Sequence, residues 1–274
     1  MQTHCQTPGR NFCAPSGKVA ALFVDLDGTI IECQPNFDNA KERFVHLMVM
    51  CGFDRKRATQ VMKECELHTA KTAGFERENF GKAIIAAYSQ LCKEAKRRRN
   101  RQILGICEDI GNSPFFRMPK VFPNAAAVLG RAHRKFLIIA VSIGNREAQK
   151  YKIRQGGLDP VFDRILITPN DNKVELVQAA IEDLNIDPEF SAFIGNSLRS
   201  DGASLAVTNF VHLPLESGWE YDVAELPGGG KFRKFDARDW RDAEEKAIER
   251  LIRRREMALE NGSTRSEEHA ARGC

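Results

Sequence analysis

Apolar and polar residues are distributed in three different ways along the chain. Near the start, the run VAALFVDL is apolar and ends in turn-forming residues, which predicts a strand buried on both faces. From about Asn36 to about Ile110, apolar residues recur at helical spacing, as with Phe44, Leu47 and Met48, and predict a mainly helical block. Beyond this block, strand and helix patterns alternate.

The alternating part predicts a parallel sheet with helices on both faces. The strand patterns are FLIIAVS, RILIT, SAFIG and FVHLP, and helical patterns separate them. We therefore expect an α/β fold, a Rossmann-like three-layer parallel sheet, with the helical block inserted after the first strand. Ligands of such sheets bind at the carboxyl ends of the strands.

These patterns divide the chain into four parts. Residues 19–34 and 115–235 form the expected core domain, and residues 35–114 form its helical insert. Residues 1–18 are expected to be a flexible tail. Residues 236–274 are expected to be a charged, solvated helix that ends in a disordered polar tail. Within the core domain, a further helix is expected from about Ser200.

Composition restricts the class of protein. No apolar run reaches the ~18 to 20 residues of a membrane span, and no secretory leader pattern is present, so neither a membrane partner nor export is expected. Eight cysteines without C-x-x-C spacing favour reduced thiols and a cytoplasmic location. The net charge of +4 does not by itself indicate a nucleic-acid partner, and the oligomeric state stays open.

The first strand ends in the motif D-x-D-G-T. Asp25 and Asp27 are two positions apart on extended chain, so both side chains point to the same side, and Gly28 allows a sharp turn. Two neighbouring carboxylates repel each other unless a cation lies between them, and oxygen ligands of this kind favour Mg²⁺. An EF-hand loop shares D-x-D-G, but it needs further ligands and follows a helix rather than a strand.

Three later positions complete an ordered set. Ser142 ends the next strand pattern, Lys173 begins a helix, and the strand AFIG runs into Gly195, Asn196 and, further on, Asp201. Together with D-x-D-G-T, these positions resemble the four motifs of the haloacid dehalogenase (HAD) superfamily of phosphohydrolases, over about residues 19–225. The helical insert then resembles the cap of that family.

The resemblance implies a Mg²⁺-dependent phosphomonoesterase that acts on a small phosphorylated metabolite. Asp25 would be the nucleophile that forms an aspartyl-phosphate, Asp27 the general acid and base, and Lys173 the cation that neutralises developing charge. A carboxylate at position 27 favours phosphate esters over carbon–halogen bonds, because a halide leaving group needs no proton. Thr29, Ser142 and the backbone amide of Ile143 are the expected phosphate-binding groups.

The metal ligands implied by the resemblance are Asp25, Asp27, through its backbone carbonyl, Asn196 and Asp201. Asn196 stands where the family commonly has an acid, and the second motif is SIGN, from Ser142 to Asn145, where a related branch tends to have T-K-G-D. These departures leave open a second hypothesis, a protein of this fold that binds a partner without efficient turnover. A third, weaker hypothesis is a nucleotide or nucleic-acid end phosphatase guided by Lys96 to Arg101. These residues belong to the basic cluster Lys93 to Arg101, for which a solvated helix end is the preferred interpretation because no aromatic residues are interleaved with it.

Overall fold

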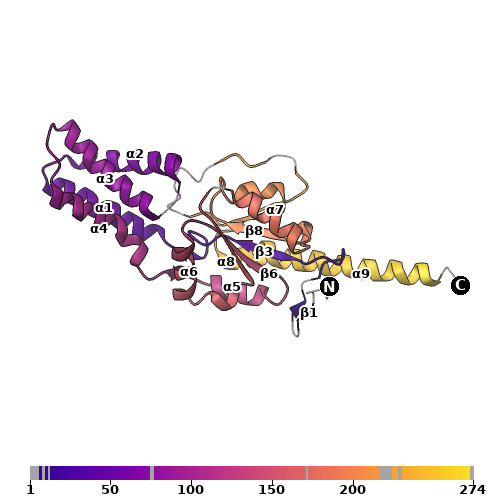
Figure 1. The fold of residues 1–274 in the computed structure, drawn as a ribbon. Coiled ribbons are helices and arrows are strands. Elements are labelled where there is room, and N and C mark those ends of the chain that lie inside the picture. The colour runs from indigo at the N-terminus through magenta and orange to yellow at the C-terminus, as the bar shows by residue number, and fades with distance from the viewer. Residues whose placement is uncertain are drawn as a thin grey trace.

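The chain folds into a sheet with flanking helices and a separate group of four helices (Figure 1). The computed structural model describes residues 6–7, 10–11, 13–74, 77–170, 172–215, 224–227 and 230–271. Within these residues, none of the helices combines the length and the apolar character that crossing a bilayer requires.

Six parallel strands form the sheet, in the order β10-β9-β8-β3-β6-β7. The central strand is the one predicted first in the sequence, with Val24 paired to Ala140 on one side and Ile194 on the other. The predicted α/β class is confirmed. The strands are β3 (Ala21–Val24), β6 (Leu137–Ile143), β7 (Arg164–Thr168), β8 (Ala192–Gly195), β9 (Asn209–His212) and β10 (Lys234–Asp236).

Both faces of the sheet are covered, as a continuous apolar strand requires. Leu22 and Val24 of β3 point into one core, and Ala21 and Phe23 point into the other, because side chains alternate along a strand. The first core lies against α5 (Ala125–Ala132), α6 (Arg146–Gln155) and the C-terminal helices, and the second against α7 (Lys173–Asp183).

The four-helix group has a core of its own. Apolar side chains at helical spacing, such as Phe44, Met48 and Val61, are buried there among the helices. The chain leaves and re-enters the sheet part through a short antiparallel pair, β4 (Ile31–Glu32) and β5 (Lys120–Val121). The helices are α1 (Gln34–Met50), α2 (Arg55–Ala73), α3 (Arg77–Glu94) and α4 (Arg101–Asn112), followed by the 3₁₀ turn η1 (Ser113–Phe116).

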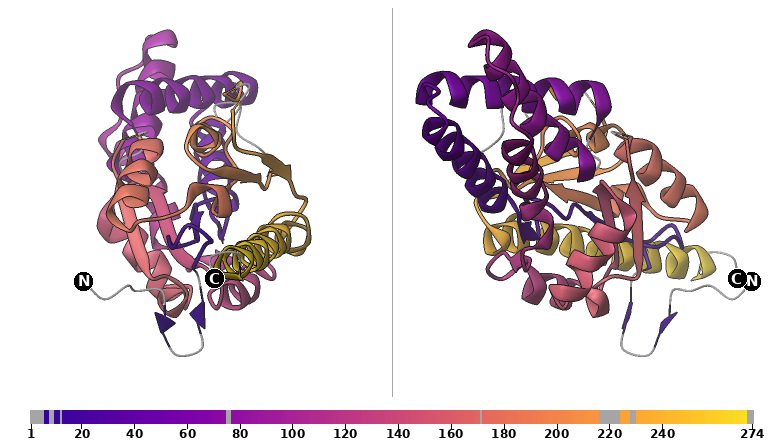
Figure 2. Two further views of the ribbon diagram at one scale, coloured as in Figure 1. Left: turned by 90° about the vertical axis from the view of Figure 1, so that its right-hand side faces the viewer. Right: turned by 60° about the vertical axis from the view of Figure 1, so that its left-hand side comes forward.

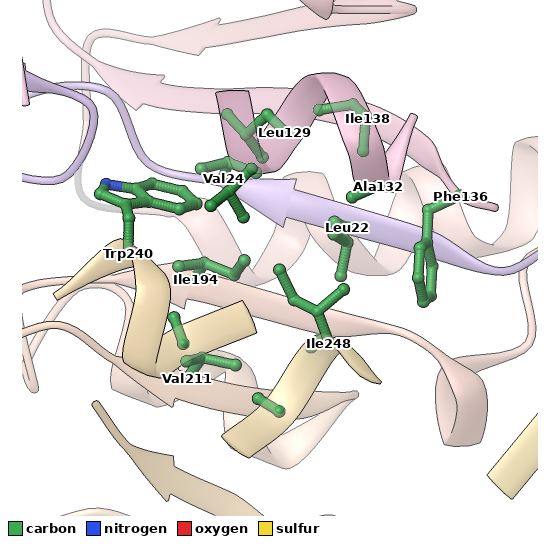
Figure 3. Close-up of a cluster of buried hydrophobic side chains, with 14 of the residues drawn as sticks. Leu22, Val24, Leu129, Ala132, Phe136, Ile138, Ile194, Val211, Trp240 and Ile248 are labelled. Atoms are coloured by element: carbon green, nitrogen blue, oxygen red, sulfur yellow. The ribbon is translucent and has the colours of Figure 1, made fainter. Parts of the chain in front are cut away.

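The C-terminal segment differs from the solvated helix that its charge predicted. Residues Lys234–Asp236 add β10 to the sheet edge, and Trp240 is buried in the first core, next to Val24 (Figure 3). Its ring N–H donates to the Thr29 carbonyl at 2.9 Å, so this segment helps to hold the D-x-D-G-T turn in place. The elements are α8 (Trp240–Ala243), a π-helical turn (Glu244–Ile248) and α9 (Glu249–Ala271). Helix α9 continues to Ala271, through most of the segment expected to be disordered.

Three smaller expectations also differ from the structure. The N-terminal segment is not a free tail, because β1 (Gln6–Thr7) and β2 (Arg10–Asn11) pair as a hairpin and Ala14 is buried (Figure 2). Cys13 is disulfide-bonded, whereas a reduced thiol was expected. The helix expected from about Ser200 is a short 3₁₀ helix, η4 (Gly202–Ala206).

We predict that the buried Trp240 ring contributes more to the free energy of unfolding than an exposed side chain of the same segment does. Trp240→Ala should lower the free energy of unfolding by about 3–5 kcal/mol, the usual cost of removing a buried aromatic side chain. Trp240→Phe, which loses mainly the hydrogen bond to Thr29, should lower it by about 1 kcal/mol. Urea denaturation measures both, with Arg253→Ala on the exposed face of α9 as the control. Equal effects of Trp240→Ala and the control would contradict the packing described here.

Candidate active site

The carboxyl ends of β3, β6 and β8 open into one cavity beneath the four-helix group. The cavity has a volume of about 260 Å³ and is lined by residues of both parts of the chain. Every site residue predicted from the four motifs lines it except Thr29, whose hydroxyl lies just behind Asp25. The predicted residues lining the cavity are Asp25, Asp27, Ser142, Ile143, Lys173, Asn196 and Asp201.

A buried lysine joins two buried carboxylates at the cavity floor. Lys173, the first residue of α7, places its Nζ 2.5 Å from Asp25 Oδ1 and 2.7 Å from Asp201 Oδ1. All three side chains are less than 5% exposed. Their charges therefore interact in an environment where little solvent screens them.

These contacts set the protonation of the group. Burial raises the pKa of Asp25 to about 7, and the Asp201 charge adds to this shift, while the Lys173 ammonium opposes it. Burial disfavours the charged form of Lys173, but the two carboxylates outweigh it and raise the pKa of Lys173 well above its ordinary value. Lys173 is therefore a fixed positive charge, and Asp25 is the member that titrates near neutral pH.

Both carboxylate oxygens of Asp201 accept hydrogen bonds at the cavity floor. One oxygen accepts from Lys173, and the other accepts from the Ser197 backbone N–H at 3.0 Å. Gly195 makes room for it, since a Cβ there would lie 2.3 Å from Asp201 Oδ2. Asp201 therefore holds Lys173 and the turn after β8, and its ligation of a metal stays a prediction.

Asp27 is held by two residues that the motifs did not predict. Lys152 Nζ lies 2.8 Å from both Asp27 oxygens, and Gln149 Nε2 donates to Asp27 Oδ2 at 2.7 Å. Burial disfavours the charged form of Lys152, but the Asp27 and Cys33 charges outweigh it and raise the pKa of Lys152. Gln149 and Lys152 are three positions apart on α6, which begins directly after the second motif, and this helical spacing is the signal that could have found them.

Gln149 also connects Asp27 to the second motif. Its Nε2 lies 2.9 Å from Ser142 Oγ and 2.8 Å from the Ile143 carbonyl, in addition to its contact with Asp27. Its Oε1 is buried and has no hydrogen-bond partner among the described residues. One acceptor beside Ser142 is thus left for water or a bound molecule.

The altered second motif is compensated locally. Asn145 caps α6 by accepting from the Glu147 and Ala148 N–H groups at 3.1 Å, a role in which asparagine and aspartate are equivalent. Lys152 lies two turns further along α6 and places its ammonium group beside Asp27, whereas position 143 is an isoleucine and supplies no cation. The sequence departures therefore do not leave the site without a second cation.

The oxygen atoms near Asp25 suit a hard divalent cation. Thr29 Oγ1 lies 3.0 Å from Asp25 Oδ2 and 3.1 Å from Asn196 Oδ1. A carboxylate oxygen and an amide oxygen are therefore both within hydrogen-bond distance of one hydroxyl group. Gly28 has a φ of +83°, and a Cβ there would lie 2.9 Å from Asn196 Oδ1, so the turn needs glycine. Among the described residues no cluster of three His, Cys, Asp or Glu could hold a metal, so such a cation would rely on the amide and on backbone oxygen as well.

The basic cluster lies away from the cavity. Residues Lys93 to Arg101 join the end of α3 to the start of α4, whereas the lining residues of these helices, Asn79, Phe80 and Ala83, come from the opposite end of α3. Arg97 instead donates to the Cys51 carbonyl and lies over the Phe53 ring. The cluster is thus a solvated end of the helical group.

Comparisons with known proteins agree with this fold. The family described as haloacid dehalogenase-like hydrolase matches residues 19–207. No curated protein matches the chain. Among solved structures, a haloacid dehalogenase-like family hydrolase from Xanthomonas campestris is similar, with a TM-score of 0.68 and 16% identity over 88% of this chain and 98% of that one.

Two further structures show the range of similar proteins. The putative HAD-hydrolase YfnB from Bacillus subtilis, bound to magnesium, has a TM-score of 0.58 and 15% identity, over 83% of this chain and 98% of that one. L-2-haloacid dehalogenase from Xanthobacter autotrophicus, with chloropropionic acid covalently bound, has a TM-score of 0.51 and 14% identity, over 85% and 98%. Such identities show a shared fold and leave the reaction to be argued from the site.

We predict a pH dependence of stability that comes from Asp25. Between pH about 4 and 7, the folded chain keeps a proton on Asp25 that the unfolded chain has lost. The free energy of unfolding should therefore fall as pH rises through that range in metal-free buffer, and this contribution should level off above pH 7. Thermal melts of Asp25→Asn should lack this component, and Asp183→Asn, an exposed control, should retain it. Parallel pH curves for wild type and Asp25→Asn would contradict the raised pKa.

Proposed function

The chain belongs to the haloacid dehalogenase-like hydrolases, as its four motifs predicted, and on that basis we propose that it is a Mg²⁺-dependent phosphomonoesterase acting on a small phosphorylated metabolite. The observation that carries the proposal is the pairing of two differently held carboxylates at one cavity. Asp25 is buried against Lys173, and Asp27 is held separately by Lys152 and Gln149. Two carboxylates in different environments can serve as nucleophile and as acid and base.

In the first step, the Asp25 carboxylate attacks the phosphorus atom and the bond from phosphorus to the ester oxygen breaks. Asp27 in its acid form gives its proton to the leaving alcohol, and an aspartyl-phosphate remains on Asp25. Lys173 places a fixed positive charge beside the oxygens on which negative charge develops.

In the second step, water replaces the alcohol. Asp27 takes a proton from the water, the water oxygen bonds to phosphorus, and the acyl-phosphate bond breaks to release inorganic phosphate and the Asp25 carboxylate. Ser142, Thr29 and the Ile143 amide are the proposed contacts for phosphate oxygens, with Gln149 holding Ser142 in place. Gln149 and Lys152 keep Asp27 at the cavity between the two steps.

Asp27 is the reason to prefer a phosphatase over a dehalogenase, since both kinds of protein share this fold. Halide leaves as a stable anion and needs no proton, so a dehalogenase has no use for a second acid two residues after its nucleophile. Here that acid is present, lines the cavity and is held by two side chains. These contacts keep a second carboxylate at the cavity, and we propose that this group transfers the proton to an alcohol leaving group.

We propose that Mg²⁺ is held by Asp25, Asn196 and the Asp27 carbonyl, the oxygen set around the D-x-D-G-T turn. When bound, the cation would supply charge neutralisation for the phosphate and lower the pKa of Asp25 from its metal-free value. Asn196 contributes an oxygen without charge, so the proposed affinity for the cation is lower than with an acid at that position. The magnesium in the YfnB structure supports the same choice of ion.

The two other hypotheses receive less support from the site. A protein that only binds a partner would not need Asp27 and Asp25 in separate hydrogen-bonded environments. A nucleic-acid end phosphatase would need cations beside the cavity mouth, whereas the basic cluster is at the other end of α3. A cytoplasmic location stays part of the proposal: the five free cysteines among the described residues support it, and the disulfide at Cys13 argues against it.

We predict that the protein releases phosphate from an aryl phosphate when Mg²⁺ is present and stops when a chelator removes it. Asp25→Asn should abolish turnover, because the amide is not a nucleophile. Asp27→Asn should lower kcat by about 10²- to 10⁴-fold, the usual contribution of general acid–base catalysis. Asp109→Asn, on α4 outside the cavity lining, is the matched control and should keep wild-type rates. Wild-type activity no faster than Asp25→Asn would favour the binding hypothesis.

A further inference from the structure

The helical side of the cavity has a different chemistry from the sheet side. The sheet side contributes three cations to the lining, Lys152, Lys173 and Arg199, where the phosphate of a substrate belongs. Among the described lining residues of the four-helix group, Glu66 of α2 is the one that carries a charge, and it is negative. The sheet side also lines the cavity with three carboxylates, Asp25, Asp27 and Asp201, so its formal charges balance, whereas the helical side carries a net negative charge.

Three phenylalanine rings lie on this helical side. The ring of Phe37 is nearly perpendicular to Phe80, with centroids 5.0 Å apart at 88°, and to Phe115, with centroids 5.5 Å apart at 86°. All three rings line the cavity, and we call them the phenylalanine box. These edge-to-face pairs are ordinary aromatic packing, and a ring face that stays open to the cavity can attract an ammonium group within about 6 Å of its centroid.

Glu66 gives the helical side of the cavity a formal negative charge. Its neighbour Lys41 is 3.6 Å away but closer to Asp38, at 3.0 Å, so the three side chains together carry one negative charge. Burial raises the pKa of Glu66, and Lys41 only partly opposes the shift. A ligand cation would offset the cost of keeping this carboxylate ionised.

The side-chain amide N–H groups on this side of the cavity already have partners, and Glu66 and Thr69 are its other polar lining residues. Gln34 Nε2 donates to Asp38 at 2.9 Å. Asn79 Nδ2 donates to the carbonyls of Ala73 and Gly74, and its Oδ1 accepts from Lys82 at 3.0 Å. A polyol would leave its own hydroxyls unpaired against the rings, at a cost of about 1–3 kcal/mol for each buried group.

Resting on the proposed function, we infer that the substrate is the phosphate monoester of an amino alcohol, with its ammonium group in the phenylalanine box beside Glu66 and its phosphate at Asp25. Hydrolysis then consumes one water and yields the free amino alcohol and inorganic phosphate. The cavity of about 260 Å³ suits an ester of this size and is below the ~300–1,000 Å³ typical of pockets for larger ligands.

The test compares choline phosphate with 3,3-dimethylbutyl phosphate, which has the same shape but carries carbon in place of the charged nitrogen. The full-length protein should hydrolyse the choline ester with a kcat/KM about tenfold or more above that of its neutral counterpart. Glu66→Gln should reduce this ratio toward one, because it removes the negative charge while keeping the size of the side chain. Glu64→Gln, exposed two positions away on α2, should leave the ratio unchanged.

Calorimetric binding of both esters to Asp25→Asn separates this inference from the proposed function. If aryl phosphate is hydrolysed but both esters bind and react equally, the ammonium inference is overturned and the phosphatase stands. If no ester is hydrolysed but the choline ester still binds about tenfold more tightly, the inference about ligand class stands and the phosphatase fails. A Glu66→Gln variant that keeps the full preference also overturns the role given to Glu66.

Discussion

The contact of Lys173 with Asp25 and Asp201 is the interaction on which the site depends. Without the lysine, two carboxylates would be buried close together with no opposite charge, and breaking such a buried pair costs about 3–5 kcal/mol. With it, Asp25 can lie under the cavity at a pKa of about 7, ionisable near neutral pH and screened from bulk water. The same contact fixes the start of α7 to the ends of β3 and β8.

The parallel sheet makes this contact possible. Asp25 and Asn196 follow adjacent strands whose carboxyl ends meet at one edge, and Lys173 reaches the same edge from the first turn of its helix. The C-terminal segment then supports the turn from the opposite side, through Trp240 and the Thr29 carbonyl. The four helices line the cavity with groups unlike those of the sheet.

The sequence predicted the parts of the fold that have a strong local pattern. Apolar strand patterns placed Asp25, Ser142 and Asn196 at the ends of strands that meet at one sheet edge, and the resemblance to the HAD motifs added Lys173 at its helix start. The roles of Gln149 and Lys152 depend on how α6 packs, and the separate tasks of Asp201 and Trp240 depend on contacts with residues more than 25 positions away. A charged C-terminal segment also has the composition of a solvated helix, although Trp240, Ile248 and Leu251 within it are buried in the first core.

The central claim is that the Asp25 carboxylate forms a covalent bond to phosphorus. In this experiment, the protein is mixed with aryl phosphate and Mg²⁺, quenched in acid and treated with borohydride. Borohydride reduces an aspartyl-phosphate to homoserine, and mass spectrometry identifies the modified residue. The account predicts homoserine at position 25 in wild type and an enrichment of it in Asp27→Asn, where the second step lacks its base. Steady phosphate release with an unmodified residue at position 25, or homoserine at another position, would contradict it.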